Sequence, residues 1–583
     1  MIRIKDHKQG QLFDHWAYLG AKRRRLLEAS WPGLFRRHIL DELPVEEMRP
    51  FFNQDFGRPS KEIYAVLGLM LLQQAMDLTD KEAQARMGFD LQWHYALDVT
   101  DESDEFTYIS EKTIWTIRQI MIENNLDQSM LDKVTRKLAK VFEVDADKQR
   151  LDSVHIKSNM RKLGRVGLLA RTIAKFLANL KRRRKDLFET ISEETVKRYL
   201  GPKSLQAFAM VKPSETDRSL KTLAEDLYAL IEGFKDREEV RSMSSYKLME
   251  RVLSEQCVVE GGNEDSAVAV KKPKEISSDS LQNPSDPDAA YSGHKGQGYQ
   301  VQVMETFTTT EDAAEKERTL NLITHVEVER ACAHDAKALP PAIEDANRAG
   351  LGPRTLLADS HYGGDENMQT AESLGVELVS PAMPGSRKDG PDLADFRYDE
   401  RGTVTACPAG HAPVKAEYYG DTGRHSASFA LELCAVCPLA EKCAAKPGKK
   451  YRYLRYPDKE QRLAVRRAEE KTDAFVEQYR WRAGVEATMS QYDRLTGVKR
   501  LRVRGLPNVR FCAVLKAAGL NLLRAARVML ARKRASGADF NRLWSKNGLI
   551  FFVREHIGRL FTFKNEFWPE SVWVADGHLK LAA

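Results

Sequence analysis

Three side chains in the last fifth of the chain, Tyr479, Arg482 and Glu486, have types and a spacing that could act on a phosphodiester. At i, i+3 and i+7 of an α-helix they would lie along one face. A carboxylate binds a hard cation, a guanidinium grips a phosphate through two hydrogen bonds, and a tyrosine hydrogen-bonds or stacks beside them. The set therefore predicts cutting or joining of a phosphodiester. The alternative is a solvated amphipathic helix with an Arg–Glu pair.

Two further acids occur where strands are expected. Asp152 lies in QRLDSVHIKSN, a short segment rich in β-branched residues, in which an aspartate is disfavoured. Asp359 ends a predicted buried strand at residues 354–359, the crevice position at which open α/β sheets place ligands. An edge-strand position would also explain Asp152, and helix capping would explain Asp359.

Convergence of Asp152, Asp359 and Glu486 on a sheet would require cations to offset their repulsion. Two Mg²⁺ ions about 3.5–4 Å apart are the usual solution in polymerases and nucleases, one activating the attacking oxygen and one stabilising the leaving oxygen. Other acids and histidines near these positions have structural explanations as helix caps, turn residues or loop residues. They are Asp335, Asp365, Asp286, Asp288, His155, His334 and His361.

Length and composition indicate a folded protein with several cores. The chain has 583 residues, of which 42% are hydrophobic and 30% charged. No run reaches the roughly 18–20 apolar residues of a membrane span, and the first ten residues lack the apolar centre of a signal peptide. We therefore expect a cytoplasmic protein.

Positive charge is concentrated towards the C-terminus. Residues 446–534 contain 24 Lys/Arg and 8 Asp/Glu, a local charge of +16, so the rest of the chain sums to −9 to give the net +7. Residues 494–534 contain 12 basic residues and no acidic one. This density predicts a nucleic-acid partner. A solvated helix face or contacts to acidic parts of the same chain would also account for it.

The elements that must position these residues begin with helices over residues 1–145. Residues 61–76 predict an apolar helix, and Thr79 stands three residues before Glu82 in a capping-box pattern that begins the next helix. Two short helices joined by a tight turn and followed by Trp-His-Tyr at 93–95 fit a DNA-binding helix-turn-helix. Any helical bundle has the same pattern.

The middle of the chain alternates between helical and strand patterns. A helical stretch at 161–257 is followed at 261–288 by Gly, Ser, Asn and Pro, which are typical of a mobile linker. Residues 298–306 alternate as a strand does, and we expect them to pair antiparallel with 320–328. Further elements are expected as a helix at 336–349, a helix ending near 374 and a strand at 376–380.

Four of the seven cysteines are clustered. They lie in CPAGH and CAVCPLAEKC and are Cys407, Cys434, Cys437 and Cys443. Thiolates spaced as C-x2-C with two more nearby can form a tetrahedral Zn²⁺ site, in which His411 or His425 could replace one thiolate. Four reduced structural thiols are the alternative.

Together these motifs resemble a known family, the DDE transposases of bacterial insertion sequences, which have an RNase H-like fold. RLDSVHIKSN is similar to the family's first-acid strand, DPDAAYSGHKGQGYQVQVMET to the following strand region, and LLADSHYGGDEN to the second-acid segment. Tyr479, Arg482 and Glu486 match the Tyr-x2-Arg-x3-Glu signature of one large branch. The resemblance implies that Asp152, Asp359 and Glu486 are catalytic Mg²⁺ ligands and that Tyr479 and Arg482 bind the DNA strand.

One position departs from that branch. Its signature continues with Lys seven residues after Glu, but this chain has Asp493 there and Arg494 beside it. Position 493 lies two turns from Glu486 on the same face, whereas Arg494 is turned by about 100°. Either Arg494 makes the DNA contact, with Lys499 as a less suitable substitute, or the contact is weakened. The other basic residues expected to bind DNA are Arg500, Arg502 and Arg504.

The resemblance implies an α/β fold, an RNase H-like mixed sheet with helices, interrupted by a helical and a Cys-rich insertion and preceded by an all-helical domain. The expected parts are a DNA-binding domain at 1–145, a catalytic domain at 146–160, 290–384 and 456–535, a helical insertion with linker at 161–289, a zinc-binding insertion at 385–455 and a C-terminal extension at 536–583.

The expected function is that of a DDE transposase. It would bind the terminal inverted repeats of its element as a homodimer, cut double-stranded DNA with two Mg²⁺ ions and join the 3′-hydroxyls to target DNA. The alternatives are an RNase H-like nuclease that no longer transposes and a catalytically inactive, zinc-containing DNA-binding protein.

Overall fold

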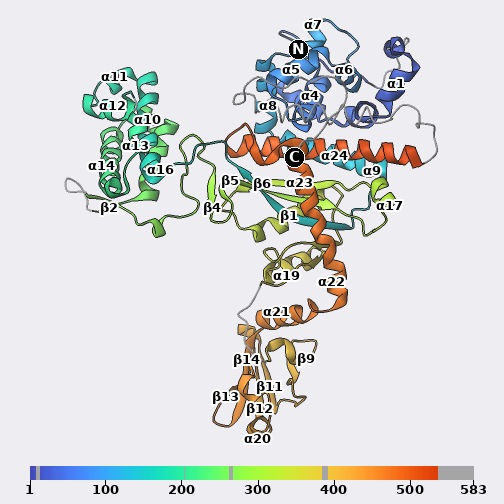
Figure 1. Cartoon of the computed structure of the whole chain (residues 1–583), viewed down its shortest axis with the longest axis vertical. Coiled ribbons are helices and arrows are strands. Elements are labelled where there is room, and N and C mark those ends of the chain that lie inside the picture. The colour runs from blue at the N-terminus through green and yellow to red at the C-terminus, as the bar shows by residue number, and fades with distance from the viewer. Residues whose placement is uncertain (8–13, 203, 261–266, 384–390, 536–583) are drawn as a thin grey trace, which may run out of the picture.

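The computed structural model describes residues 1–7, 14–202, 204–260, 267–383 and 391–535. Figure 1 shows a group of N-terminal helices above a sheet, a helical insertion to one side and a small lobe at the far end of the molecule. The expected C-terminal extension at 536–583 lies outside the described residues. Within the described ranges, no helix combines the length and apolar character needed to cross a membrane.

A six-stranded mixed sheet lies at the centre. Its strands are β1 (Lys148–Lys157), β4 (Ala290–Ser292), β5 (Gly296–Thr306), β6 (Ile323–Arg330), β7 (Thr355–Leu357) and β8 (Glu377–Val379). β5 pairs antiparallel with β1 on one edge and with β4 and β6 on the other. β7 and β8 continue the sheet in parallel with β1. This mixed α/β architecture is consistent with an RNase H-like fold, which confirms the expected fold class.

Alternation along β5 divides the interior into two cores. Tyr299, Val301 and Val303 are buried in a core that also contains the N-terminal helices. Met304 is buried in a second core against α18 (Leu339–Arg348) and α19 (Asp365–Ser373). Because both faces are covered, β5 is a central strand, and its predicted antiparallel pairing with β6 is confirmed. A shorter helix, α17 (Ala313–Arg318), lies between β5 and β6 in the chain.

The N-terminal region is helical, as expected. Its helices are α1 (Gly20–Glu28), α2 (Trp31–Leu34), α3 (Val45–Met48), α4 (Ile63–Ala75), α5 (Asp80–Phe89), α6 (Leu91–Ala96), α7 (Asp104–Thr107), α8 (Glu111–Glu123) and α9 (Leu126–Phe142). The predicted capping box begins α5: the Glu82 N–H donates to Thr79 Oγ1 (3.2 Å) and the Thr79 N–H to Glu82 Oε2 (2.8 Å). Residues 93–95 are buried in α6, so they pack inside the bundle.

The long helix α24 (Leu506–Ala535) lies between the N-terminal helices and the sheet (Figure 1). It packs against α4, α9 and β6. Its buried Asn521 donates from Nδ2 to Ile323 O (2.8 Å) and accepts the Ile323 N–H (2.8 Å), which ties the helix to the start of β6. α24 therefore joins the first and the central parts of the chain in one core.

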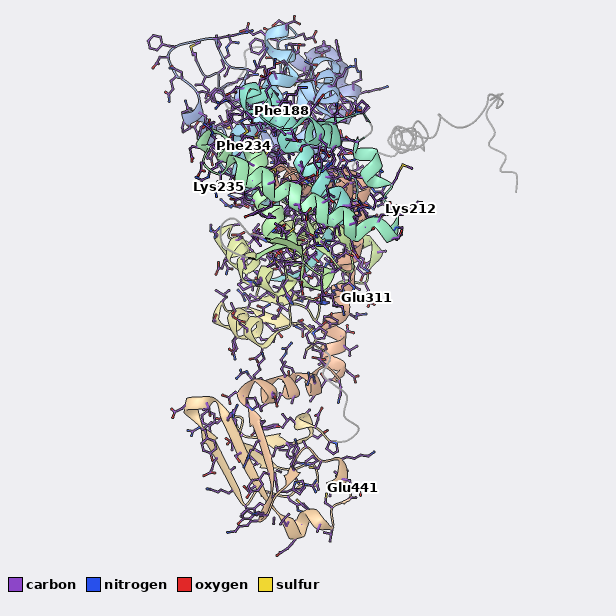
Figure 2. The ribbon with its side chains drawn as sticks, turned by 90° about the vertical axis from the view of Figure 1, so that its left-hand side faces the viewer. Phe188, Lys212, Phe234, Lys235, Glu311 and Glu441 are labelled. Carbon is purple, nitrogen blue, oxygen red and sulfur yellow. The ribbon has the colours of Figure 1, made fainter. Side chains whose placement is uncertain are left out.

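The helical insertion follows β1 and has a hydrophobic core of its own. It contains α10 (Arg165–Arg183), α11 (Lys185–Phe188), α12 (Glu193–Leu200), α13 (Ser204–Ala209), α14 (Thr216–Phe234), α15 (Glu238–Arg241) and α16 (Ser244–Gln256). Figure 2 shows it facing the viewer, with Phe234 and Lys235 at the end of α14.

Residues 261–288 were expected to form a loop or mobile linker; of the described part, 271–288 form a loop with one short 3₁₀ turn, whereas 267–270 form a strand. β2 (Cys257–Glu260) pairs antiparallel with β3 (Ala267–Val270). Asp286 is fully buried and accepts hydrogen bonds from the Tyr299 hydroxyl (2.5 Å) and the Gly505 N–H (3.0 Å). These bonds fix the segment to the sheet and to the start of α24, although its Pro- and Ser-rich composition is that of a loop.

The Cys-rich segment forms the small lobe at the bottom of Figures 1 and 2. Glu441 of this lobe is labelled in Figure 2. Its elements are β9 (Arg397–Tyr398), β10 (Val404–Ala406), β11 (Lys415–Tyr419), β12 (Arg424–Ala430), α20 (Leu431–Ala435), β13 (Lys446–Pro447) and β14 (Tyr451–Pro457). The lobe has its own small core, which includes Phe396 and Phe429. α21 (Asp458–Glu469) leads back from the lobe to α19, where Arg462 pairs with Asp365 (2.7 Å).

Candidate active site

The guanidinium of Arg482 lies among the three predicted acids. Its Nη2 is 2.8 Å from Asp152 Oδ2 and 3.9 Å from Asp359 Oδ2, and its Nη1 is 3.7 Å from Glu486 Oε1. Three carboxylates from distant segments therefore contact one cation. We expect the guanidinium to offset the repulsion that these carboxylates would otherwise exert on one another.

The three acids differ in burial and support. Asp152 lies inside β1 with its side chain 15% exposed, and its Oδ1 accepts the Ser153 N–H (2.8 Å). Burial raises the pKa of the Asp152 carboxyl, although the neighbouring Arg482 charge acts in the opposite direction. The Glu486 side chain, in the first turn of its helix, is 73% exposed. Asp152 is thus the enclosed end of the group and Glu486 the open end.

Asp359 lies two residues beyond the end of β7, so the expected strand is shorter than predicted. The cause is a turn at this position, where Asp359 Oδ1 accepts the His361 N–H (2.8 Å) and Asp359 O accepts the Ser380 hydroxyl (2.6 Å). The turn places the carboxylate beside Arg482. The neighbouring Asp335 and Asp365 are the first residues of their helices but not the predicted caps, which are His334 and Gly364. Asp335 accepts from Gln302 Nε2 (3.0 Å), and Asp365 pairs with Arg462 (2.7 Å).

The expectation that Tyr479, Arg482 and Glu486 share one α-helix is wrong. The helix α22 (Asp473–Tyr479) ends at Tyr479, a 3₁₀ turn η11 (Arg480–Ala483) carries Arg482, and α23 (Gly484–Thr496) begins before Glu486. Arg150 Nη1 donates to the Trp481 carbonyl (2.9 Å) in this turn. The tighter turn leaves Arg482 and Glu486 in contact across the junction.

Arg150, two residues before Asp152, makes contacts near the acids that no motif in the sequence predicted. Its Nη2 lies 2.7 Å from the fully buried carboxylate of Glu305 on β5, which also pairs with Arg524 of α24 (3.0 Å). A Cβ on Gly484 would lie 2.0 Å from Arg150 Nη1, so a larger residue at this position would displace the Arg150 guanidinium from its present place. The network fixes η11 and α23 against β1. No local sequence pattern reveals it, because its members are far apart in the chain.

Tyr479 packs beside the acids without a hydrogen bond to them. Its ring stacks on Phe475 at 5.5 Å, and both lie against buried Leu357 and Val379 at the ends of β7 and β8. Burial raises the pKa of the Tyr479 hydroxyl, so the neutral phenol is the form present near neutral pH. One face of the site is therefore aromatic.

The residues expected to bind DNA fall into two groups. Arg494 is exposed on α23, and Arg500 lies in the short 3₁₀ helix η12 (Val498–Arg500). Arg502 pairs with Asp77 (2.9 Å), and Arg504 donates to the Asn159 carbonyl (2.6 Å). The latter two arginines thus hold protein groups together in this structure.

Lys499 lies close to the position at which the signature lysine is missing. Its Nζ is 4.0 Å from Asp493 Oδ2, and its backbone N–H donates to Asp493 Oδ1 (3.1 Å). A lysine charge is thus present beside position 493, delivered from the next turn of the chain. Arg494 follows position 493 directly in the chain, and its side chain is exposed on α23.

Two basic residues of the block at 494–534 pair with acids inside the protein, although most of the others are exposed. Lys516 of α24 is buried, and its Nζ lies 2.8 Å from Asp77 Oδ1. Arg524 pairs with Glu305, as described above. The expectation that the whole block grips DNA phosphates is wrong for these residues, because they bind acids of the same chain.

A groove of about 780 Å³ runs from the acids along β1 and α23. Its charged lining residues are Asp77, Asp152, Lys157, Lys295, Glu486, Asp493, Lys499 and Arg500. Two predicted acids and two predicted DNA-binding residues therefore share one concave surface. Lys157 and Lys295 are further cations on this surface, and no sequence motif marked them as candidate DNA-binding residues.

The carboxylates suit a hard cation by their chemistry, and the position of Arg482 shows that the space between them accepts positive charge. In the described part of the chain, no three His, Cys, Asp or Glu residues are grouped as a metal ion would require. With Arg482 between them, the acids are held apart.

The four clustered cysteines line one small cavity of about 20 Å³ together with His411. The Cys437 N–H donates to Cys434 O (3.3 Å), and the Cys407 N–H donates to His411 O (2.9 Å), so Cys434 and Cys437 share one turn and Cys407 and His411 another. Burial raises the pKa of the Cys434 thiol. His425 does not line this cavity: its Nε2 lies 2.6 Å from Asp458 Oδ1 and its ring stacks on Tyr456.

Comparison with known families gives one match. A family model described as a transposase DDE domain matches residues 406–526, which include the Cys-rich lobe from Cys407, η11, α23 and most of α24. The match supports a DDE-type transposase. A search of curated proteins finds no match.

Proposed function

We propose that this chain is a DNA transposase that binds the terminal inverted repeats of an insertion sequence, cuts the DNA ends by metal-assisted hydrolysis and transfers the 3′-hydroxyls to target DNA. The observation that carries the proposal is the contact of Asp152, Asp359 and Glu486 with one guanidinium at 2.8–3.9 Å. The family match over residues 406–526 supports the same reading.

Asp152, Asp359 and Glu486 would hold two Mg²⁺ ions, which when bound activate the attacking oxygen and stabilise the leaving oxygen. The donor set fits, since carboxylate oxygens are the protein ligands that Mg²⁺ prefers. The enclosed Asp152 and the exposed Glu486 leave the site open on the side of the groove. A DNA strand would enter from that side.

Arg482 positions the scissile phosphate. Its guanidinium has a planar fork that matches two phosphate oxygens, and a bound cation would free it from the carboxylates. Arg150 holds the turn that carries Arg482, so the fork is directed by a bond to the Trp481 carbonyl. Tyr479 offers a neutral hydroxyl and a ring beside the strand.

DNA affinity is proposed to come from Arg494, Lys499 and Arg500, which lie on or beside the groove. Contacts to backbone phosphates make binding fall steeply with salt. Two ends must be cut together, so a homodimer on DNA is the proposed working form. We also propose that the four cysteines hold a structural Zn²⁺ ion in the small lobe, which would stiffen it without a part in catalysis.

The test is Mg²⁺-dependent cleavage of a duplex that carries the end of the element, comparing wild type with Glu486→Gln at concentrations that give equal DNA occupancy. We expect cleavage to fall at least about 100-fold, because the variant loses a carboxylate that binds metal. Equal cleavage by the two proteins would show that Glu486 is not a ligand. Cleavage without joined products indicates a nuclease, and binding without cleavage indicates an inactive DNA-binding protein.

A further inference from the structure

The groove beside the acids has a second cationic position on the opposite side from α23. Lys295 lies in the turn between β4 and β5, and its Nζ is 3.2 Å from Ser153 Oγ, the residue after Asp152. Lys157, at the end of β1, lines the same groove. Among the described residues, neither lysine forms an ion pair with a carboxylate. Two cations therefore face open space within a few residues of the predicted catalytic strand.

His155 lies between them. Alternate residues of a strand share a face, so Ser153, His155 and Lys157 form a row on one face of β1 and Asp152 lies on the other, and residues of both faces line the groove. Both ring nitrogens of His155 are buried near the backbone of Gln297 and Tyr299. Burial lowers the pKa of His155, and the charges of Lys295 and Lys157 lower it further. The ring is therefore neutral, and the positive charge on this side of the groove comes from the two lysines.

The other charged groups of the groove are already engaged or belong to the site. Asp77 pairs with Arg502 and Lys516, and Asp493 with Lys499. Asp152 and Glu486 contact Arg482. The β1 side of the groove thus carries two lysines that form no ion pair with a carboxylate among the described residues, an arrangement that suits an anion.

We propose that Lys295 and Lys157 form a phosphate subsite for the DNA backbone next to the scissile position. Lys295 is the principal residue, because it is the cation nearest to Asp152 on this side of the groove and is carried by a short β-hairpin turn. The subsite rests on the proposed function. It would grip the strand from β1 while Lys499 and Arg500 grip it from the α23 side, so the strand is held from both walls of the groove.

The first test is the salt dependence of binding to the end duplex, measured by fluorescence anisotropy without Mg²⁺. We expect Lys295→Ala to weaken binding about tenfold and to reduce the slope of log affinity against log salt by about one, the value for one lost phosphate contact. Lys295→Arg should restore the slope. Lys235→Ala, which removes an exposed lysine from the helical insertion (Figure 2), is the charge-matched control and should leave the slope unchanged.

The second test replaces single phosphates of the end duplex by uncharged methylphosphonates. At one position near the cut, neutralisation should weaken binding by wild type but not by Lys295→Ala, because the variant has already lost that contact. The subsite is wrong if Lys295→Ala keeps the wild-type slope, or if every substitution weakens both proteins equally.

The two proposals can fail separately. If wild type cuts the end duplex and Lys295→Ala keeps the wild-type slope, the transposase proposal stands and the subsite proposal fails. If wild type binds the end duplex and a scrambled duplex equally well, the proposed recognition of the transposon end is wrong. The slope is therefore also measured on the scrambled duplex, where Lys295→Ala should still lose about one unit. Unfolding midpoints of the variants, expected to equal that of wild type, exclude misfolding.

Discussion

The Arg150 guanidinium lies 2.7 Å from the carboxylate of Glu305, whose side chain is fully buried. The pair links β1 to β5 two residues before Asp152, and the same arginine donates to the Trp481 carbonyl at 2.9 Å. The strand with the first acid and the turn with Arg482 are thus fixed by a single side chain. Its loss should affect stability and site geometry together.

We expect Arg150→Met to lower the free energy of unfolding by about 3 kcal/mol, because Glu305 would keep its burial and lose one of its two arginines. Arg354→Met is the matched control, since Arg354 is 82% exposed and lies 3.4 Å from Asp147; its change should be under about 1 kcal/mol. Urea unfolding measures both. Equal changes in the two variants would show that the network does not stabilise the fold.

Arg482 and a divalent cation compete for the same carboxylates. We expect Arg482→Ala to bind Mn²⁺ about tenfold more tightly, because a charge within 4 Å of a carboxylate interacts with it by about 1–4 kcal/mol. Calorimetry measures the affinity, and DNA cleavage should fall in the same variant because the phosphate loses its fork. Arg480→Ala is the neighbouring control, since Arg480 pairs with Glu311 (2.6 Å) and Glu477 (2.8 Å) instead. Unchanged or weaker Mn²⁺ binding by Arg482→Ala would contradict the competition.

Acid should weaken the N-terminal region through Asp98. Burial alone would raise the pKa of this carboxyl, but hydrogen bonds from His7 and Lys5 and the Arg36 charge lower it from 3.8 to about 2. Because the folded pKa is the lower one, the ionised form contributes about 2 kcal/mol that is fully present above pH 4 and lost as the pH falls towards 2.

The corresponding variant is Asp98→Asn. Its unfolding free energy should be lower than that of wild type at pH 5, and the difference should shrink as the pH falls from 4 to 2. Asp55→Asn, at an exposed position, should follow wild type throughout. A constant difference between Asp98→Asn and wild type over this range would mean that Asp98 has an ordinary pKa.

The proposed zinc site predicts a zinc content of about one ion per chain, measured by elemental analysis of protein purified without chelators. Cys437→Ser should lose the metal and lower the melting temperature of the small lobe, because a bound ion would tie together the turns that carry the thiolates. Cys332→Ser, outside the cavity, should keep the zinc. Wild type without zinc, with four thiols equally reactive before and after chelator treatment, would support four reduced structural thiols.

Local chemistry made part of the fold predictable. The capping box at Thr79 and Glu82 depends on residues three positions apart, and the strand around Asp152 follows from its β-branched composition. The i, i+4 contact of Arg482 with Glu486 is likewise local. These predictions required only neighbours in the sequence.

The remaining features depend on residues far apart in the chain. Asp286 has the composition of a turn around it, yet Tyr299 and Gly505 convert it into a buried anchor. Lys516 was included in the basic block because its partner, Asp77, lies in the N-terminal region and cannot be identified from the surrounding sequence. The 3₁₀ turn at Arg482 depends on Arg150, more than 300 residues earlier. Charge counts and periodicity do not contain such pairings.

The position of α24 has a consequence for synthesis of the protein. Helices α4 and α9 leave the ribosome early, but the helix that completes their core is the last described one, Leu506–Ala535. A nascent chain that has not yet released α24 would expose the apolar surface on which it packs. We therefore expect α4 and α9 to reach their final packing only after α24 has been translated.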